Sequence, residues 1–163
     1  MIDLRGPRGM AAACAVAAVL SGCTSTGFGP SAPSEPAVAP EIPASIAATE
    51  VTGRWGYAAY HRPEDRARTE AAARNGCRNA YVINPGASGG VIMHLADEAQ
   101  PQELRLKGGP GGKNYIGPPG PAGSEKDREI LSFDGRVMPL RFIDQDAATR
   151  YGTGVYVRCA PRA

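Results

Sequence analysis

From residue 53 onward, apolar and polar side chains alternate in short runs, and this two-residue period is typical of β-strands that bury one face. The first run, 53–60, places Trp55, Tyr57 and Ala59 on one side. Further strands are predicted at 80–83, 91–96, 103–107, 113–116, 130–133, 137–143 and 153–159. Short strands separated by turns favour a mainly β fold, a small antiparallel barrel or sandwich of about seven to eight strands.

Two runs near the C-terminal end carry more specific expectations. Asp134-Gly135 separates the sixth run from the seventh, and this dipeptide is a strong signal for a two-residue hairpin. In the last run, the alternation places Val155 and Val157 together, and we expect them on the inner face.

One helix is predicted over residues 63–74. Pro63 suits the first turn of a helix, and the two acidic residues after it suit the positive end of the helix dipole. Most of the remaining residues are Ala, Arg and Glu, which favour helices. Ala67 and Ala71 are four residues apart, so we expect this small-residue face to lie close to the sheet.

Residues 108–123 interrupt the strand pattern with a run rich in glycine and proline. Proline has no amide hydrogen to donate, so such a run cannot form a central strand. We therefore expect a long surface loop around the brief strand at 113–116.

Residues 24–50 contain five prolines among Ser, Ala, Gly and Thr, and few large apolar side chains. This composition cannot bury enough apolar surface to offset the entropy lost on ordering, so a disordered tether is expected before a single domain at 51–163. Prolines make such a tether semi-extended, and at about 3.1 Å per residue it would reach roughly 80 Å. A segment that binds a partner in the polyproline conformation is the alternative.

The first 22 residues have the features of a secretory signal peptide. Arg5 and Arg8 supply the positive start, and 10–20 is an uncharged apolar run of eleven residues. A helix needs about 20 such residues to span a bilayer, so we expect a cleaved leader (1–22) rather than a transmembrane anchor.

The sequence Leu20-Ser21-Gly22-Cys23 ends this leader and resembles the bacterial lipobox. The resemblance implies cleavage before Cys23, a diacylglyceryl thioether on its sulfur, and usually an acyl chain such as palmitate on its amine. Several buried acyl chains, at about 0.8 kcal/mol per CH₂, hold a protein firmly to a membrane. Thr24 stands where an aspartate often signals retention in the inner membrane, which favours the outer membrane, facing the periplasm. An ordinary signal peptide with a chance cysteine is the alternative.

The four cysteines have separate fates on this interpretation. Cys14 lies in the leader and Cys23 is the lipidation site, so Cys77 and Cys159 remain in an oxidising compartment. We predict that these two form a disulfide, which closes a loop of about 82 residues and is worth roughly 4–5 kcal/mol in the chain-entropy model. Two free thiols are the alternative. No metal site is expected, because the chain has no Cys-x-x-Cys pair and only two histidines.

Charge gives no indication of a nucleic-acid partner. The chain has 18 Lys and Arg against 16 Asp and Glu, a net charge of +2. The basic residues are scattered among acidic ones, so no nucleic-acid-binding surface is expected.

No catalytic constellation is found in the sequence. Residues 86–90, Gly-Ala-Ser-Gly-Gly, fit the Gly-x-Ser-x-Gly pattern, but a strand rather than a helix is predicted after them, so we interpret them as a hairpin loop. His61 and His94 have no partner at a recognisable spacing. An enzyme would need polar groups such as His94, Glu103 and Arg105 to converge in one cleft. We therefore expect no enzyme activity and no cofactor.

Gly53-Arg54-Trp55 opens the predicted domain and is similar to the Gly-x-Trp motif that opens lipocalin-like barrels, including small periplasmic protease inhibitors. The resemblance implies that Trp55 plugs the closed end of a barrel. The helix predicted after the first strand departs from that family, which has a loop there and its main helix near the C-terminus. Trp55 as an ordinary core aromatic residue is the alternative.

These features favour a non-enzymatic, lipid-anchored module that binds a partner or interacts with the cell envelope. Its partners would be the membrane, through Cys23, and an envelope protein or a small apolar ligand. A lipocalin-like carrier is one alternative and needs a cavity, which would be lined by Met93, Leu95, Leu104, Leu106, Met138, Leu140 and Phe142. A protease inhibitor that presents a loop or its N-terminal segment is the other.

Overall fold

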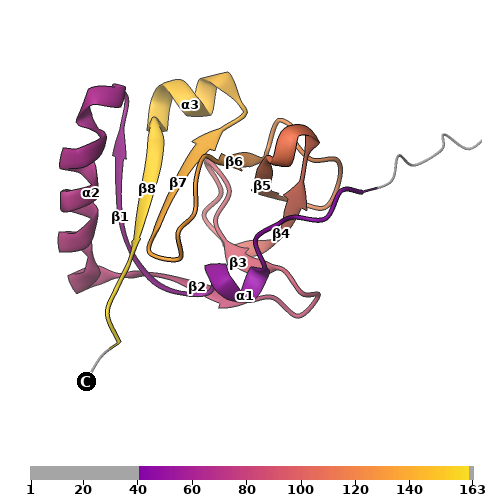
Figure 1. Ribbon diagram of the computed structural model, residues 1–163, viewed down its shortest axis with the longest axis horizontal. Coiled ribbons are helices and arrows are strands. Elements are labelled where there is room, and N and C mark those ends of the chain that lie inside the picture. The colour runs from indigo at the N-terminus through magenta and orange to yellow at the C-terminus, as the bar shows by residue number, and fades with distance from the viewer. Residues whose placement is uncertain (1–40, 162–163) are drawn as a thin grey trace, which may run out of the picture. The chain divides into compact units, whose positions relative to one another are not determined.

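The computed structural model describes residues 41–161, which form a closed barrel of eight antiparallel strands (Figure 1). Each strand pairs with its neighbours in the sequence, and β8 returns to pair with β1. The strands are β1 (Gly53–Tyr60), β2 (Tyr81–Pro85), β3 (Val91–Met93), β4 (Gln102–Gly108), β5 (Asn114–Gly117), β6 (Arg128–Ile130), β7 (Val137–Phe142) and β8 (Thr153–Arg158). The expected fold class is confirmed, with the barrel in place of the sandwich. The expected leader, Cys23 and the tether up to residue 40 lie outside the described residues.

Alternate side chains of the strands point into the barrel and form its main core. The register keeps the inward residues of neighbouring strands together: Tyr156 on β8 lies opposite Met138 on one side and Tyr57 on the other. The fully buried side chains of this core are Val51, Trp55, Ile83, Val91, Met93, Leu104, Ile116, Met138 and Leu140.

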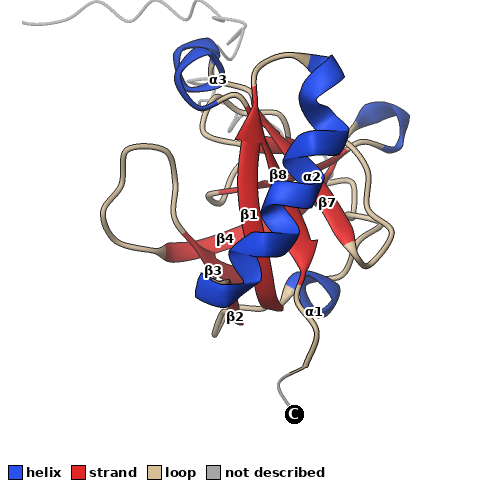
Figure 2. Ribbon diagram, turned by 90° about the vertical axis from the view of Figure 1, so that its left-hand side faces the viewer, coloured by secondary structure: helices blue, strands red, loops and turns tan. Residues whose placement is uncertain are grey.

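Helix α2 (Arg66–Asn75) lies on the outside of the barrel, across β1 and β8 (Figure 2). Thr69 and Ala73 are buried, whereas Ala67 and Ala71 are exposed, so the predicted packing face was wrong. Both pairs have a spacing of four residues, and spacing alone does not decide which pair meets the sheet. Gly56 on β1 permits the close approach, because a Cβ atom there would lie 1.8 Å from the Ala73 carbonyl oxygen.

Strand β8 is buried on both faces. Tyr156 points inward, while Val155 and Val157 lie on the outer face and form a second small core with Ala73 of α2. The prediction that the two valines lie on the inner face was therefore wrong. Alternation groups side chains by face, but it does not identify the inner face when a helix covers the outer one.

The β6–β7 connection is longer than predicted. β6 ends at Ile130, and residues 131–136 form the connection. The Asp134 carboxylate accepts hydrogen bonds from the backbone amides of Arg136 and Val137 at 2.8 and 2.7 Å. The predicted two-residue hairpin was wrong, because this side chain binds the amides locally and the paired strands stop before the turn.

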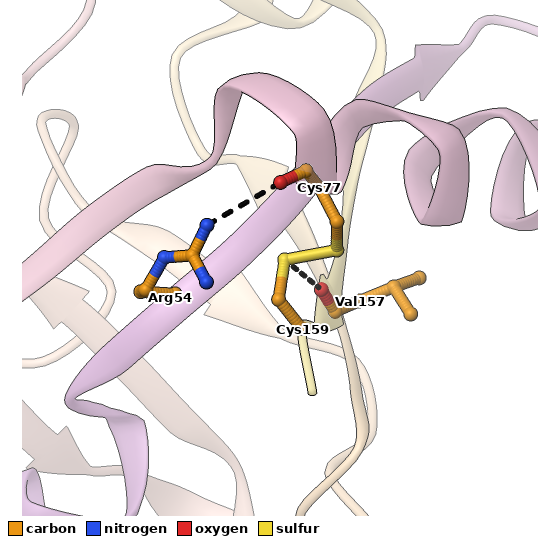
Figure 3. Close-up of a disulfide and its surroundings, with 4 residues drawn as sticks. All are labelled: Arg54, Cys77, Val157 and Cys159. Atoms are coloured by element: carbon orange, nitrogen blue, oxygen red, sulfur yellow. Dashed lines mark hydrogen bonds between the residues drawn. A yellow bond between two sulfur atoms is a disulfide. The ribbon is translucent and has the colours of Figure 1, made fainter. Parts of the chain in front are cut away.

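The predicted disulfide between Cys77 and Cys159 is present (Figure 3). The two Cα atoms are 5.6 Å apart, and the cysteines are separated by 82 residues in the chain. The bridge joins the 3₁₀ turn Gly76–Asn79, which follows α2, to the residue after β8. Arg54 Nη2 donates to the Cys77 carbonyl at 3.4 Å beside it. The helix is therefore fastened to the last strand.

The folded domain begins earlier in the chain than expected. Ile42 forms a β-bridge with Gly108, whose amide donates to the Ile42 carbonyl at 3.0 Å. The Ser45 amide donates to Asn114 Oδ1 at 2.8 Å, and Asn114 Nδ2 donates to Ser45 Oγ at 2.9 Å. The expected boundary at residue 51 was therefore too late, because the segment before it packs on the β4–β5 connection.

Candidate functional site

The two ends of the barrel are filled differently. We call the end at which β1, β3, β5 and β7 begin the closed end, and the end at which they finish the mouth. Helix α1 (Ala48–Val51) precedes β1 at the closed end. Helix α3 (Gln145–Tyr151), between β7 and β8, lies at the mouth, far from α1 (Figure 1).

The closed end is packed and hydrogen-bonded. The Trp55 ring is fully buried there, and its Nε1 donates to the Val51 carbonyl of α1 at 2.9 Å. The Arg158 guanidinium lies 4.2 Å from the centre of this ring. The same guanidinium donates to three carbonyls, those of Glu50, Thr52 at 3.0 Å and Gly135 at 2.6 Å. Each polar group described here has a protein partner.

Besides a hollow of about 240 Å³ between residues 42–45 and the β4–β5 connection at the closed end, the barrel has a cavity of about 230 Å³ at the mouth. Its apolar lining comes from Leu95, Ala96, Phe142 and Ala147. The charged residues around it are four acids and two bases, namely Asp97, Glu98, Glu125, Asp144, Lys126 and Arg150. The cavity therefore has an apolar floor and a rim with an excess of acidic groups.

Arg128, the first residue of β6, points into the barrel next to this cavity. It pairs with Phe142 across the sheet, is 5% exposed, and lies 5.7 Å from the centre of the Phe142 ring. Its Nη2 donates to the His94 carbonyl at 2.8 Å. Its Nε is buried and has no hydrogen-bond partner among residues 41–161. No described ion pair links Arg128 to an acidic side chain.

Three tyrosines surround the same part of the interior. The ring of Tyr156 lies 4.9 Å from that of Tyr57 and 5.8 Å from that of Tyr81, between ring centres. Burial raises the pKa of Tyr156 and of Tyr57 above the usual tyrosine value, while the charge of Arg128 and, for Tyr156, a hydrogen bond with the Arg128 side chain oppose the rise. Both hydroxyls are therefore neutral at neutral pH and can donate hydrogen bonds. Tyr57 is 44% exposed and connects the cluster to solvent.

His94 links the cluster to the β3–β4 connection. Its backbone amide donates to the Tyr81 hydroxyl oxygen at 3.0 Å, and its Nδ1 lies 3.2 Å from the same oxygen. With its carbonyl bound by Arg128, His94 is held on both sides of its peptide unit. The positions of Arg128 and Tyr81 are therefore coupled through one residue.

A polar contact joins the β3–β4 connection to α3 over the mouth. Asp97, which has a φ of 60°, accepts from Arg150 Nη2 at 2.7 Å and from the Tyr151 hydroxyl. We call this contact the Asp97 clasp. The Tyr151 hydrogen bond, with a further contribution from Arg150, lowers the pKa of Asp97 below its usual value. The clasp fixes one side of the cavity rim.

The Gly-Ala-Ser-Gly-Gly segment is a loop between β2 and β3, which agrees with its interpretation as a hairpin loop. Glu103 Oε1 accepts from the amides of Ser88 at 2.8 Å and Gly90 at 2.9 Å. The Gly90 amide is the main cause of the lowered pKa of Glu103. Glu103 thus has a structural role in this loop, with the Arg105 charge also lowering its pKa. The His94 ring contacts the Tyr81 hydroxyl instead.

The residues expected to line a carrier cavity mostly fill the interior instead. Met93, Leu104, Met138 and Leu140 are at most 1% exposed and pack in one cluster. Two of the seven, Leu95 and Phe142, border the mouth cavity. The part of the barrel below the mouth is therefore occupied by side chains.

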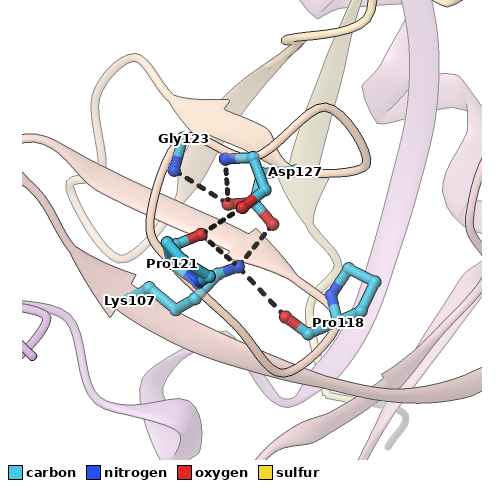
Figure 4. Close-up of polar contacts among 6 residues, drawn as sticks. Lys107, Pro118, Pro121, Gly123 and Asp127 are labelled. Atoms are coloured by element: carbon cyan, nitrogen blue, oxygen red, sulfur yellow. Dashed lines mark hydrogen bonds and ion pairs between the residues drawn. The ribbon is translucent and has the colours of Figure 1, made fainter. Parts of the chain in front are cut away.

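The Gly/Pro-rich loop between β5 and β6 is organised by one ion pair (Figure 4). Lys107 Nζ lies 2.6 Å from Asp127 Oδ1 and also donates to the carbonyls of Pro118 at 3.0 Å and Pro121 at 3.1 Å. Asp127 Oδ2 accepts from the Gly123 amide at 2.9 Å. The pair is buried, so the loop is held from inside.

Arg128 and its tyrosine neighbours were not identified as a site from the sequence. Arg128 follows Lys126 and Asp127, and this charged run was not assigned to a strand. The available signal was the two-residue spacing between Arg128 and Ile130, which places both on one face of a strand.

Comparisons with known proteins do not add an identity: no family model, no curated protein and no solved structure matches the chain. In the described range, 41–161, no helix is both long and apolar enough to cross a bilayer. The same range contains no group of three or more His, Cys, Asp and Glu side chains arranged to hold a metal ion.

Proposed function

We propose that this chain is an exported lipoprotein, attached to a membrane through Cys23, and that its barrel is a non-enzymatic binding module of the cell envelope. The leader and the lipobox resemblance support export and attachment. Thr24 supports the outer membrane as the location. The binding surface in this proposal is the mouth.

The observation that carries the proposal is the difference between the arginines at the two ends of the barrel. At the closed end, Arg158 and Trp55 have partners within the protein. At the mouth, the chain leaves a cavity and a buried cation, Arg128, whose Nε has no partner within 41–161. Ligand sites are concave, with an apolar lining and a few placed polar groups.

The packed interior supports a partner that reaches only the mouth. Met93, Leu104, Met138 and Leu140 occupy the space that an apolar cargo would need. A lipocalin-like carrier would have to displace these side chains, and refilling or reopening a packed core is costly. The module therefore receives a small group or a protruding part of a larger partner.

Site-specific photocrosslinking tests this proposal in the native envelope. A photoreactive residue at Glu98, on the rim of the mouth, is expected to give discrete adducts. The matched control is Ala71, exposed on α2 on the outside of the barrel, and it is expected to give none. Equal yields from both positions would contradict the mouth as the binding surface.

The lipid attachment has its own test. Mass spectrometry of the protein purified from the membrane fraction is expected to show a chain that begins at an acylated Cys23. Cys23→Ser is expected to release the protein into the soluble periplasmic fraction. An uncleaved leader, or a Cys23→Ser protein that stays in the membrane fraction, would contradict this part of the proposal.

Protease inhibition is a second candidate, favoured by the fixed Gly/Pro-rich loop. A loop that is ordered before binding loses little entropy when it binds, which suits an inhibitor. The full-length protein is expected, on this candidate, to slow at least one of a panel of periplasmic and secreted proteases. Lys107→Met removes the internal support of the loop and should abolish the inhibition. Lys126→Met, a change at an exposed lysine of the same loop, is the control and should leave the inhibition unchanged.

A further inference from the structure

The geometry points to a carboxylate-binding site at Arg128: the mouth receives a singly charged carboxylate group, which forms an ion pair with the Arg128 guanidinium. This inference rests on the proposed function, because it names the chemistry that the mouth recognises. It concerns Arg128, which the sequence analysis did not single out and whose guanidinium has no acidic partner among the described residues.

The first step is that Arg128 cannot remove its own charge. A buried lysine or histidine can lose a proton, but a guanidinium stays charged in proteins. A buried charge is strongly disfavoured unless it is paired and hydrogen-bonded. Arg128 is 5% exposed, donates to the His94 carbonyl through Nη2 and hydrogen-bonds to the Tyr156 hydroxyl, and its buried Nε has no partner in the described chain.

The second step is that the flanking acids are engaged elsewhere. Asp127 binds Lys107 and the amides of the Gly/Pro-rich loop. Glu129 points to the outer face, where it pairs with Arg141 at 2.5 Å and with Lys113 at 3.3 Å. Arg128 therefore lies between two acidic residues in the sequence, and its side chain pairs with neither. An anion from outside the chain would supply the missing partner.

The third step is access from the cavity. Arg128 bonds to the carbonyl of His94 and lies against the Phe142 ring. The next two residues after His94, together with Phe142, line the mouth cavity. Arg128 is not itself a lining residue, but it contacts one of them, Phe142, and the residue that precedes two others, His94. The cavity volume of about 230 Å³ is below the range of about 300–1,000 Å³ typical of sites for drug-sized ligands, so a small group fits it.

The final step concerns the charge of the ligand. The rim has four carboxylates against two cations, an excess that opposes the entry of any anion and opposes a multiply charged one most strongly. A singly charged carboxylate meets the least repulsion, and it can form paired hydrogen bonds with a guanidinium, whose planar fork matches it. The hydroxyls of Tyr57 and Tyr156 lie within reach of the Arg128 charge, and that of Tyr156 hydrogen-bonds to Arg128, so both can add donors for a bound carboxylate. The carboxylate belongs either to a small organic acid or to the C-terminus of a polypeptide.

The test follows the Nε–H signal of Arg128 in nuclear magnetic resonance spectra of the purified full-length protein. The probes are acetate, N-acetyl-dialanine with a free carboxylate, and the same peptide with an amidated C-terminus. Acetate is expected to shift the signal in a saturable way, at constant ionic strength against chloride. If the free peptide binds more tightly than acetate, the source of the carboxylate is a polypeptide C-terminus. If acetate binds more tightly, the source is a small organic acid. The amidated peptide is expected not to bind in either case.

Variants make the assignment specific. Arg128→Met is expected to weaken acetate binding at least tenfold, measured on the signals of the surrounding tyrosines, while Arg128→Lys keeps part of it. Arg141→Met, which removes an arginine from the outer face of the next strand, is the control and should bind acetate as the wild type does. Absence of a saturable shift in the wild type, or equal binding by Arg128→Met, overturns the inference.

The outcomes also separate this inference from the proposed function. Crosslinks at Glu98 without acetate or peptide binding would leave the mouth as a binding surface and remove the carboxylate site. Acetate binding without crosslinks at Glu98 would keep the site and remove the mouth as the contact surface for an envelope partner.

Discussion

The closed end and the mouth each contain an arginine beside an aromatic ring, yet the two arginines have different surroundings. Arg158 lies over Trp55 and donates to three backbone carbonyls. Arg128 lies near Phe142 and donates to the carbonyl of His94, and its Nε has no partner in residues 41–161. The same residue type therefore stabilises one end of the barrel and leaves unused binding capacity at the other.

On the proposed function, stability is concentrated at the closed end and recognition at the mouth. The segment before β1, the Trp55 contacts and the disulfide region close one end. Regions that bind partners are commonly less stable than the structural core, because they must adapt to a ligand. Removing the features of the closed end should therefore cost more stability than removing those of the mouth.

Loss of the disulfide should have the largest effect. Cys77→Ser combined with Cys159→Ser is expected to lower the free energy of unfolding by roughly 4–5 kcal/mol, because the bridge spans 82 residues and restricts the unfolded chain. Urea unfolding followed by circular dichroism measures the change. Wild-type protein treated with reductant is the control and should lose a similar amount. An unchanged urea midpoint in both would show that the bridge contributes little.

Trp55→Ala is expected to cause the second-largest loss in the free energy of unfolding. The substitution leaves a cavity at the closed end and removes the hydrogen bond to the Val51 carbonyl, which together are expected to cost about 3–5 kcal/mol. Phe142→Ala, the matched change at the mouth, is expected to cost less than about 2 kcal/mol, because Phe142 is only partly buried. Thermal unfolding of both variants measures the two stability losses. A larger loss for Phe142→Ala than for Trp55→Ala would contradict the view that the closed end contributes more to stability than the mouth.

The two arginines give the most direct contrast. Arg158→Met is expected to lower the free energy of unfolding by about 2–3 kcal/mol, because three carbonyls lose a charged donor. Arg128→Met is expected to change it by less than about 1 kcal/mol or to raise it, because an unpaired buried charge is removed. Equilibrium unfolding in buffer without carboxylates measures both. Equal losses would mean that both arginines are structural.

The smallest effect is expected at the Asp97 clasp, which is exposed. Its hydrogen bonds to Tyr151 and Arg150 lower the pKa of Asp97, so the ionised form is favoured in the folded state. The contribution of this group to stability is therefore present above the usual aspartate pKa of about 3.9 and is lost as pH falls through the lower folded value. The Tyr151 ring signals should stay constant from neutral pH down to that range and change only below it. Asp97→Asn should remove this acid transition; a transition at higher pH would contradict the assignment.

Part of the fold followed from local patterns in the sequence. The strand at 53–60 and the last strand were found because their side chains alternate, and the disulfide was found because two cysteines remained after the leader and lipobox were assigned. These inferences depend on neighbours in the sequence or on counting. They succeed because strand pairing between sequence neighbours builds most of this barrel.

The rest depends on which surfaces meet in space. Val155 and Val157 were placed on the wrong face because the position of α2 is a property of the whole fold. Ala67 and Ala71 were preferred over Thr69 and Ala73 for the same reason. Arg128 was missed because its importance depends on its neighbours: Asp127 and Glu129 both pair with other side chains and leave Arg128 without an acidic partner. No local pattern records that a side chain lacks a partner.

The Ile42–Gly108 bridge has a mechanical consequence. A pulling force applied upstream of residue 41 acts first on this bridge and on the Ser45–Asn114 hydrogen bonds, which are few and can break one after another. Peeling residues 41–47 away would free seven residues, whose fully extended length is at most about 23 Å at about 3.3 Å per residue, before any strand of the barrel is stretched. Under such a load, this segment would extend before the barrel does.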